Sequence, residues 1–380
     1  MSEYLYYEFL AIDRPLDRQA QGRLRQLSSR ARISATTFTN HYEWGDFRGD
    51  PLDLMTRWFD LHLFFANWRS RRLMIRVPVR FLRRADLNAF LRHVDWVEIR
   101  TAGDNVIVDI CPDEVEPNGE WSDDGSGWLA ALAPLRADVL SGDLRLFYLL
   151  WLAAVQYELV PDDEVEPLPG IGPLTGALEA FAEFFRINSD LVQAAAEVCA
   201  DEPTMSKGDV RRALAGIPEE ERIELLLRVM EGDAHVAADL ANRIRGAASA
   251  RVGGRTAHAL RTRMQELEAA REQANVKRHE AERRRAAKIA DKERRIRLDA
   301  LRKRGDKVWQ EIEVEVERRL PQGYERAMAL LSDLQALAVE QGSQEDFDRR
   351  LASIRARHER KRTFVERLHE LDRESSGSMA

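Results

Sequence analysis

The feature that most constrains this chain is a stretch of about 65 residues, from Arg255 to Leu320, that contains no proline and one glycine, Gly305. Such a stretch can form a single helix about 100 Å long at 1.5 Å per residue. Charged pairs at i,i+4, such as Arg278 with Glu282, add about 0.2–0.5 kcal/mol each. The sequence therefore predicts a long, highly charged C-terminal helix.

The alternating segment Glu311–Glu317 has the period of a strand. Ile312 and Val316 also share a helical face with Val308 and Leu320, so the helix is predicted to continue through it. Pro321 then turns the chain into a shorter helix.

An apolar seam with the 4-3 spacing of a coiled coil follows near the C-terminus. It predicts a coiled-coil-like helical hairpin in which the last helices fold back, antiparallel, along the distal part of the long helix. The same seam could hold a protein partner or a second copy, and its two polar members could define the register. The seam consists of Phe347, Leu351, Ile354, His358, Lys361, Val365 and Leu368.

A dense basic stretch, residues 277–304, suggests nucleic-acid binding, because clustered Lys and Arg release counterions from a phosphate backbone. The alternative is a solvated helix that packs on a partner helix, since the basic residues are expected to circle the helix. The candidate nucleic-acid-binding residues are Lys277, Arg278, Arg283, Arg284, Arg285, Lys288, Lys292, Arg294, Arg295, Arg297, Arg302, Lys303 and Arg304.

The charge of the chain is divided unevenly. Residues 255–380 hold 30 Lys and Arg against 24 Asp and Glu, a balance of +6, while residues 1–254 hold 28 against 41, a balance of −13. An acidic head with a basic tail is typical of an interaction tail.

Cellular location is predicted from cysteines and apolar runs. Two cysteines, Cys111 and Cys199, make neither a disulfide framework nor a zinc site, which favours a reducing cytoplasm. No signal peptide is recognised, and the most apolar run, residues 144–155, is too short to span a bilayer. We expect a cytoplasmic protein with no membrane contact.

Residues 1–112 are predicted to form an α+β domain with helices on a single mixed sheet. Strands are expected at residues 4–12, 33–42, 61–68 and 72–77, and a hairpin is expected around Gly103. Asp50 followed by Pro51 marks a helix start, because the carboxylate caps free N–H groups and proline suits the first turn.

The remaining domains are helical. An acidic linker, residues 113–126, opens an all-α region over residues 113–250, in which residues 143–159 form a buried helix. The charged helix and its hairpin occupy residues 255–372, and residues 373–380 are expected to be a disordered tail.

The loop from Asn40 to Asp50 collects groups that can bind metals or catalyse reactions. A metal site would use His41, Glu43, Asp46 and Asp50. Against it, no known metal-loop spacing matches and Asp50 already caps a helix, so a structural or partner-contact loop is predicted, with no metal and no cofactor.

No familiar catalytic motif is present. The lone GxG of residues 170–172 follows a proline-rich loop instead of a strand, and His235 is expected to be an exposed surface residue.

The blocks YYEF and AIDRPL (residues 6–9 and 11–16) and NHYEWGDFRGDP (residues 40–51) resemble a family of uncharacterised bacterial proteins. The resemblance covers about the first 190 residues and implies a bacterial, cytoplasmic protein, but no activity. We therefore expect a non-enzymatic bacterial interaction or scaffold protein that oligomerises or docks through its C-terminal helices. The alternative is a nucleic-acid-associated accessory factor that uses residues 277–304, and a third is an enzyme with a dispersed site near residues 41–50.

Overall fold

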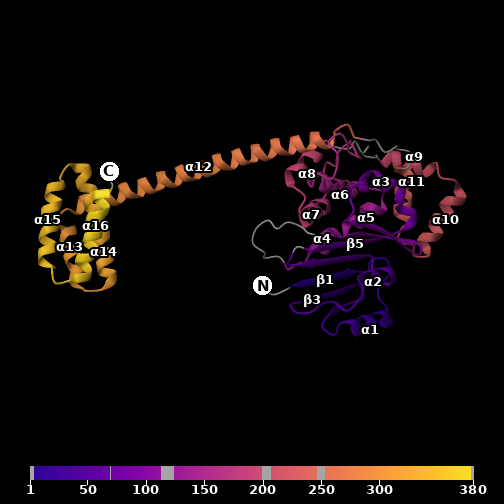
Figure 1. Cartoon of the computed structure of the whole chain (residues 1–380), viewed down its shortest axis with the longest axis horizontal. Coiled ribbons are helices and arrows are strands. Elements are labelled where there is room, and N and C mark those ends of the chain that lie inside the picture. The colour runs from indigo at the N-terminus through magenta and orange to yellow at the C-terminus, as the bar shows by residue number, and fades with distance from the viewer. Residues whose placement is uncertain (1–3, 69, 113–123, 199–206, 246–252, 378–380) are drawn as a thin grey trace. The chain divides into compact units, whose positions relative to one another are not determined.

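The computed structural model describes residues 4–68, 70–112, 124–198, 207–245 and 253–377 of the chain (Figure 1). The chain divides into two compact units, the head (residues 1–271) and the tail unit (residues 272–380). The predicted linker of residues 113–126 lies outside the described residues up to residue 123.

The head contains one seven-stranded sheet with the order β2-β3-β1-β4-β5-β7-β6. Every strand pair is antiparallel, so the predicted mixed sheet is wrong in this respect. The reason is that β3 and β4, which a helix connects, run parallel but lie on opposite sides of β1. The strands are β1 (Leu5–Leu10), β2 (Arg32–Ile33), β3 (Thr37–Tyr42), β4 (Leu61–Ala66), β5 (Arg71–Pro78), β6 (Val97–Ala102) and β7 (Asn105–Ile110).

Local signals in the sequence account for several of these elements. The predicted hairpin is confirmed, since β6 and β7 pair around Gly103, whose φ of +61° a glycine adopts without strain. The predicted helix start is also confirmed, since the Asp50 side chain accepts a hydrogen bond from the Leu52 N–H and Pro51 opens the helix.

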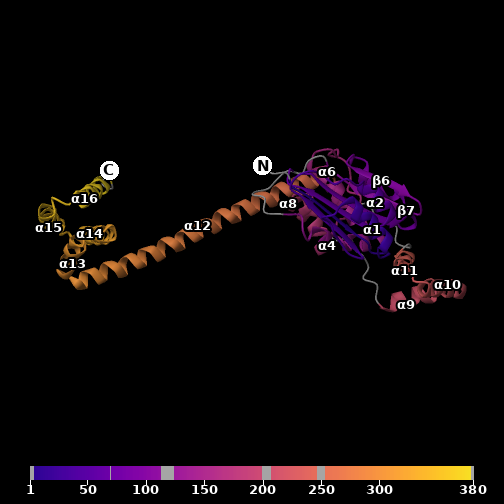
Figure 2. The same cartoon turned by 90° about the horizontal axis from the view of Figure 1, so that it is seen from below.

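The helices of the head lie on both faces of the sheet (Figures 1 and 2). One face packs with α1 and α2, and the other packs with α3–α8. The predicted buried helix is α6, whose residues 146–155 are all buried. The helices are α1 (Arg18–Leu27), α2 (Pro51–Arg57), the 3-10 turn η1 (Val79–Phe81), α3 (Arg84–Leu91), α4 (Trp128–Leu132), α5 (Pro134–Leu140), α6 (Arg145–Gln156), α7 (Gly176–Phe184) and α8 (Ser189–Ala196).

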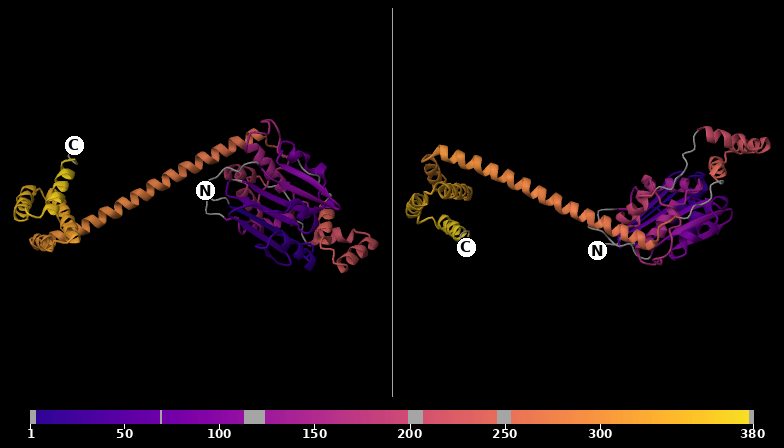
Figure 3. Two further views of the ribbon diagram at one scale, coloured as in Figure 1. Left: turned by 60° about the horizontal axis from the view of Figure 1, so that its bottom comes forward. Right: turned by 90° about the horizontal axis from the view of Figure 1, so that it is seen from above.

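Because α3–α8 and one face of the sheet bury their side chains together, residues of the α+β region and of the helical region share one core. A small group of helices, α9 (Lys207–Ala215), α10 (Glu219–Met230) and α11 (Val236–Arg245), lies at one end of the head (Figure 3).

The long charged helix is α12 (Ala257–Arg304), which begins in the head and ends in the tail unit. The prediction that it continues to Leu320 is wrong, because Gly305 adopts a φ of +55° that ends the helix. Residues 311–317 are helical, as predicted, and belong to α13 (Lys307–Glu317).

The rest of the tail unit consists of α14 (Pro321–Gln341), α15 (Gln344–Arg357) and α16 (Arg362–Gly377). These helices, α13 and the last turns of α12 share one hydrophobic core. Since α16 reaches Gly377, residues 373–377 of the expected disordered tail are helical, and residues 378–380 lie outside the described part.

Candidate nucleic-acid interface

The middle of α12 is not covered by any other described part of the chain. Residues 268–297 are all exposed, around the whole circumference of the helix. All thirteen candidate nucleic-acid-binding residues are exposed: ten lie in this stretch, and Arg302, Lys303 and Arg304 lie in the last turn of α12.

The basic residues of α12 are not spread evenly around the helix. At about 100° per residue, nine of the thirteen fall within a sector of about 120°. The expectation that they circle the helix is therefore only partly right: the other four, Arg283, Arg294, Arg297 and Arg304, lie on the far side of the helix. The sector of nine residues, the basic face, consists of Lys277, Arg278, Arg284, Arg285, Lys288, Lys292, Arg295, Arg302 and Lys303.

The tail unit buries a different side of the helix. Leu298 and Leu301, which are 3% and 4% exposed, centre about 130° around the helix from the basic face. Two basic residues outside the face serve this packing side: Arg297 lies 3.1 Å from Asp333 of α14, and Arg304 pairs with Glu311 of α13.

Few carboxylates neutralise the basic face. Between Lys277 and Arg304, Asp299 is the one acidic residue within the sector. Within the described residues, ion pairs involve two members of the face: Arg284 lies 3.9 Å from Glu280, and Arg295 lies 3.2 Å from Asp291. The face therefore keeps a local excess of positive charge although the whole chain carries −7.

A buried ion pair holds the start of α12 in the head. Glu166, 1% exposed, accepts hydrogen bonds from the Arg255 guanidinium at 2.8 and 3.0 Å. The same guanidinium donates to the carbonyl oxygens of Ala194 and Ala195 in α8. Burial, with the Glu166 carboxylate beside it, raises the pKa of Tyr148 well above its usual value, so its hydroxyl remains a donor to Glu166.

The predicted partner seam is occupied by the chain itself. Phe347, Leu351 and Ile354 of α15 and Leu368 of α16 are at most 7% exposed, within the core of the tail unit. The seam is also interrupted, because α15 ends at Arg357 and α16 begins at Arg362. The tail unit is thus a small bundle in place of the expected coiled-coil hairpin.

The polar seam residues lie at this interruption. Lys361 donates a hydrogen bond from Nζ to the carbonyl oxygen of Val316 at 2.9 Å. The His358 ring lies edge-on to Phe364, and burial together with the Lys361 charge lowers the pKa of His358. Both side chains therefore stabilise the corner between α15 and α16, and Val365 is half-buried beside them.

The loop of residues 40–50 has structural roles. The Tyr7 hydroxyl donates to Asp46 Oδ1 at 2.7 Å, and Asp50 caps α2. His41 stacks on Tyr4, and the Phe47 ring belongs to the core. Across the described ranges, His, Cys, Asp and Glu side chains nowhere gather in a group of three that could hold a metal ion. His41, Glu43, Asp46 and Asp50 are accordingly not brought together.

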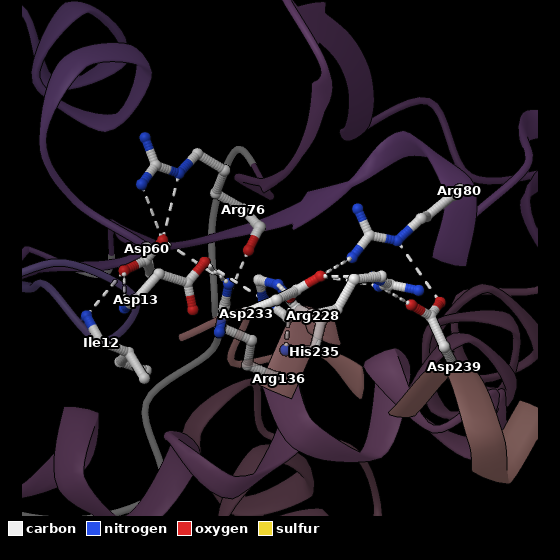
Figure 4. A network of polar contacts seen from close by, with 10 residues as sticks. All are labelled: Ile12, Asp13, Asp60, Arg76, Arg80, Arg136, Arg228, Asp233, His235 and Asp239. Atoms are coloured by element: carbon white, nitrogen blue, oxygen red, sulfur yellow. Dashed lines mark hydrogen bonds and ion pairs between the residues drawn. The ribbon is translucent and has the colours of Figure 1, made fainter. Parts of the chain in front are cut away.

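Sequence reasoning missed a network of charged side chains inside the head (Figure 4). Asp60, fully buried, accepts hydrogen bonds from the backbone N–H groups of Ile12 and Asp13 and from the Arg76 guanidinium. Arg136 of α5 donates to the Arg76 carbonyl oxygen at 2.7 Å and to Asp13 at 2.6 Å. These residues come from separate strands, loops and helices, so no spacing in the sequence signals them.

The network continues to α10 and α11. His235 Nε2 lies 3.3 Å from Asp13, and its side chain is 13% exposed, so the expectation of an exposed surface histidine is wrong. Burial raises the pKa of Asp13, but His235 and Arg136 outweigh that effect and hold it well below its usual range.

The outer part of the network consists of ion pairs. Arg80 lies 3.4 Å from Asp239 and 3.6 Å from Asp233, and Arg228 pairs with both of these carboxylates. They line a cleft of about 430 Å³ together with Glu221, Leu225, Leu240 and Arg243. The charges satisfy one another, which indicates a structural role: they attach α10 and α11 to the turn η1 that follows β5.

Comparison with protein-family models, with curated proteins and with solved structures finds no match to this chain. The resemblance of the N-terminal blocks to a bacterial family stays a prediction. In the described part of the chain, every helix is either too short or too charged to cross a lipid bilayer.

Proposed function

We propose that this protein is a non-enzymatic bacterial binding protein that attaches to nucleic acid through the basic face of α12. The observation that carries the proposal is the gathering of nine exposed basic residues in one sector of the helix. Lys and Arg side chains aligned in this way displace the counterions of a phosphate backbone, which is the main source of sequence-independent affinity.

The dimensions of the face suit this role. From Lys277 to Lys303 the helix rises about 39 Å at 1.5 Å per residue. A DNA duplex carries one charge per about 1.7 Å of its axis, so a parallel stretch offers more than twenty phosphates to nine cations. Such contacts position a protein on the nucleic acid without reading its sequence.

A partner site on the C-terminal seam is less well supported, because the seam residues would have to leave the core of the tail unit. The scaffold role predicted for the C-terminal helices is therefore assigned to the exposed middle of α12. A cytoplasmic location, favoured by the two cysteines of the chain, agrees with a nucleic-acid partner.

The proposal is tested by the salt dependence of binding to a labelled DNA duplex of random sequence. Within the described part of the chain, seven basic residues of the face have no ion pair. If these seven contact phosphates, log Kobs should fall with log salt concentration with a slope of about −6. Binding of the full chain is measured by fluorescence anisotropy. The series starts at low salt, because the expected affinity is strong only there.

A matched pair of variants separates the face from general charge. Arg285→Gln with Lys292→Gln removes two members of the face, and Arg283→Gln with Arg294→Gln removes two basic residues outside it. Both pairs change the net charge equally, and Gln preserves helix propensity. We expect the first pair to reduce the slope by about 2 and the second to leave it nearly unchanged.

Two results contradict the proposal. Equal effects of the two pairs on the salt slope would show that the basic face has no special part in binding. Absence of binding at low salt would exclude nucleic acid as the partner. Circular dichroism of each variant verifies that the helix is intact.

A further inference from the structure

The helix α10 leaves a row of apolar side chains in solvent. Ile223, Leu226, Leu227 and Met230 are 52%, 65%, 51% and 85% exposed, and none of the α10 residues is buried. Their spacing of i, i+3, i+4 and i+7 aligns them in one stripe, which is the usual pattern of a helix face that packs on another helix.

The stripe is presented by an ordered helix. On the side of α10 opposite to it, Glu221 pairs with Arg243 of α11, and Arg228 pairs with Asp233 and Asp239. Helix α11 is held to the head in turn by a hydrogen bond from Asn242 to the carbonyl oxygen of Leu140 at 2.7 Å. The intramolecular contacts of α10 therefore use its other face.

Acidic residues border the stripe on one side. Glu220, Glu224 and Glu231 are exposed and lie about 60–100° around the helix from Ile223. The other side carries Arg222 and Val229. A complementary helix must offer an apolar stripe with basic residues along one edge.

The chain contains such a helix in α12. Ile289 and Ile296 are 58% and 61% exposed and stand seven residues apart, as Ile223 and Met230 do. Arg285 and Lys292 of the basic face run along one edge of these isoleucines.

The opposite edge of the isoleucine stripe is acidic, since Glu282 and Glu293 lie there. Each helix is viewed from its N-terminus, and angles are counted in the direction in which the chain winds. The glutamates of α10 then lie at larger angles than its apolar stripe, and the basic residues of α12 lie at smaller angles than the isoleucines. Parallel packing therefore sets glutamates against basic residues, whereas antiparallel packing would set them against Glu282 and Glu293.

We propose that α10 of one copy docks on α12 of a second copy, parallel to it, with Ile223 and Met230 against Ile289 and Ile296. The contact covers about one heptad, well below the area of a standard stable interface, so the association is weak and concentration-dependent. Because the contact joins two different surfaces, repeating it builds a closed ring of copies. If the rotation between neighbouring copies does not close a ring, the same contact builds a longer chain of copies.

Sedimentation velocity of the full chain, without nucleic acid and over a wide range of concentrations, tests the contact. Met230→Glu places a charge in the stripe and should weaken the association at least about tenfold. Val229→Glu, on the same helix but about 100° away, is the control and should leave it unchanged.

A charge exchange identifies the two surfaces. Glu220→Lys with Glu224→Lys on α10, and Arg285→Glu with Lys292→Glu on α12, should each weaken self-association. Mixing the two variants should restore association between unlike copies, because the exchanged charges again attract.

A full chain that stays monomeric at every concentration overturns the proposal, as does a mixture that fails to associate. The α10 variants leave the basic face of α12 intact and should bind DNA like the wild type. Failure of the self-association proposal can therefore be distinguished from failure of the nucleic-acid proposal.

Discussion

His62 should make the head sensitive to mild acid. It lies on β4, is fully buried, and stacks on Phe9 with the ring centroids 4.0 Å apart. Its Nδ1 is 3.0 Å from the Glu8 carbonyl oxygen, which identifies Nδ1 as the protonated donor. Nε2 is buried and has no hydrogen-bond partner in the described part of the chain. A second proton on this ring would therefore have no acceptor.

Burial lowers the pKa of His62 to about 3; the Glu8 carbonyl partly opposes this effect and the charge of Arg72 adds to it. In the unfolded chain a histidine titrates near pH 6.5. Because the unfolded state takes up the proton first, stability is complete above pH 6.5 and falls as the pH decreases towards 3. At pH 5 the pKa difference corresponds to a loss of about 2 kcal/mol relative to pH 7.

The assay is urea unfolding of the full chain at pH 7 and pH 5, followed by tryptophan fluorescence. Seven of the eight tryptophans precede residue 272, so the signal reports mainly on the head. His62→Leu should remove about 2 kcal/mol of the pH dependence, whatever its effect at pH 7. Removal of an exposed histidine, His41→Leu, is the control and should preserve the pH dependence. The same decrease in wild type and His62→Leu would refute the reasoning.

Three further substitutions should lower the free energy of unfolding, measured by urea titration. Arg136→Leu removes a buried cation from Asp13 and should cost about 3 kcal/mol, because a carboxylate loses its partner. Gly170→Ala should cost about 1–3 kcal/mol or more, since φ is +110° and a Cβ would lie 2.0 Å from the Val198 carbonyl oxygen. Leu331→Ala opens a cavity in the core of the tail unit and should cost about 2–5 kcal/mol, visible as loss of the tail transition alone.

The sequence by itself determined the elements whose signals are local. Asp50 and Pro51 mark the start of α2 because a cap and a first-turn proline act within one turn of helix. The apolar composition of α6 predicts its burial, since a helix that is apolar on every side has no face for water. The absence of proline predicts α12, and Gly305 was visible as the one residue able to interrupt it.

Only the tertiary structure decided which of these elements meet. The position of β1 between β3 and β4 makes the sheet antiparallel, and no residue type encodes that order. The network around Asp60 joins residues from distant segments, so its members have no common spacing. Likewise, the apolar seam near the C-terminus predicts a packed surface but not its partner, because burial depends on what lies opposite. In the structure the chain itself supplies that partner, which leaves the exposed middle of α12 as the candidate binding surface.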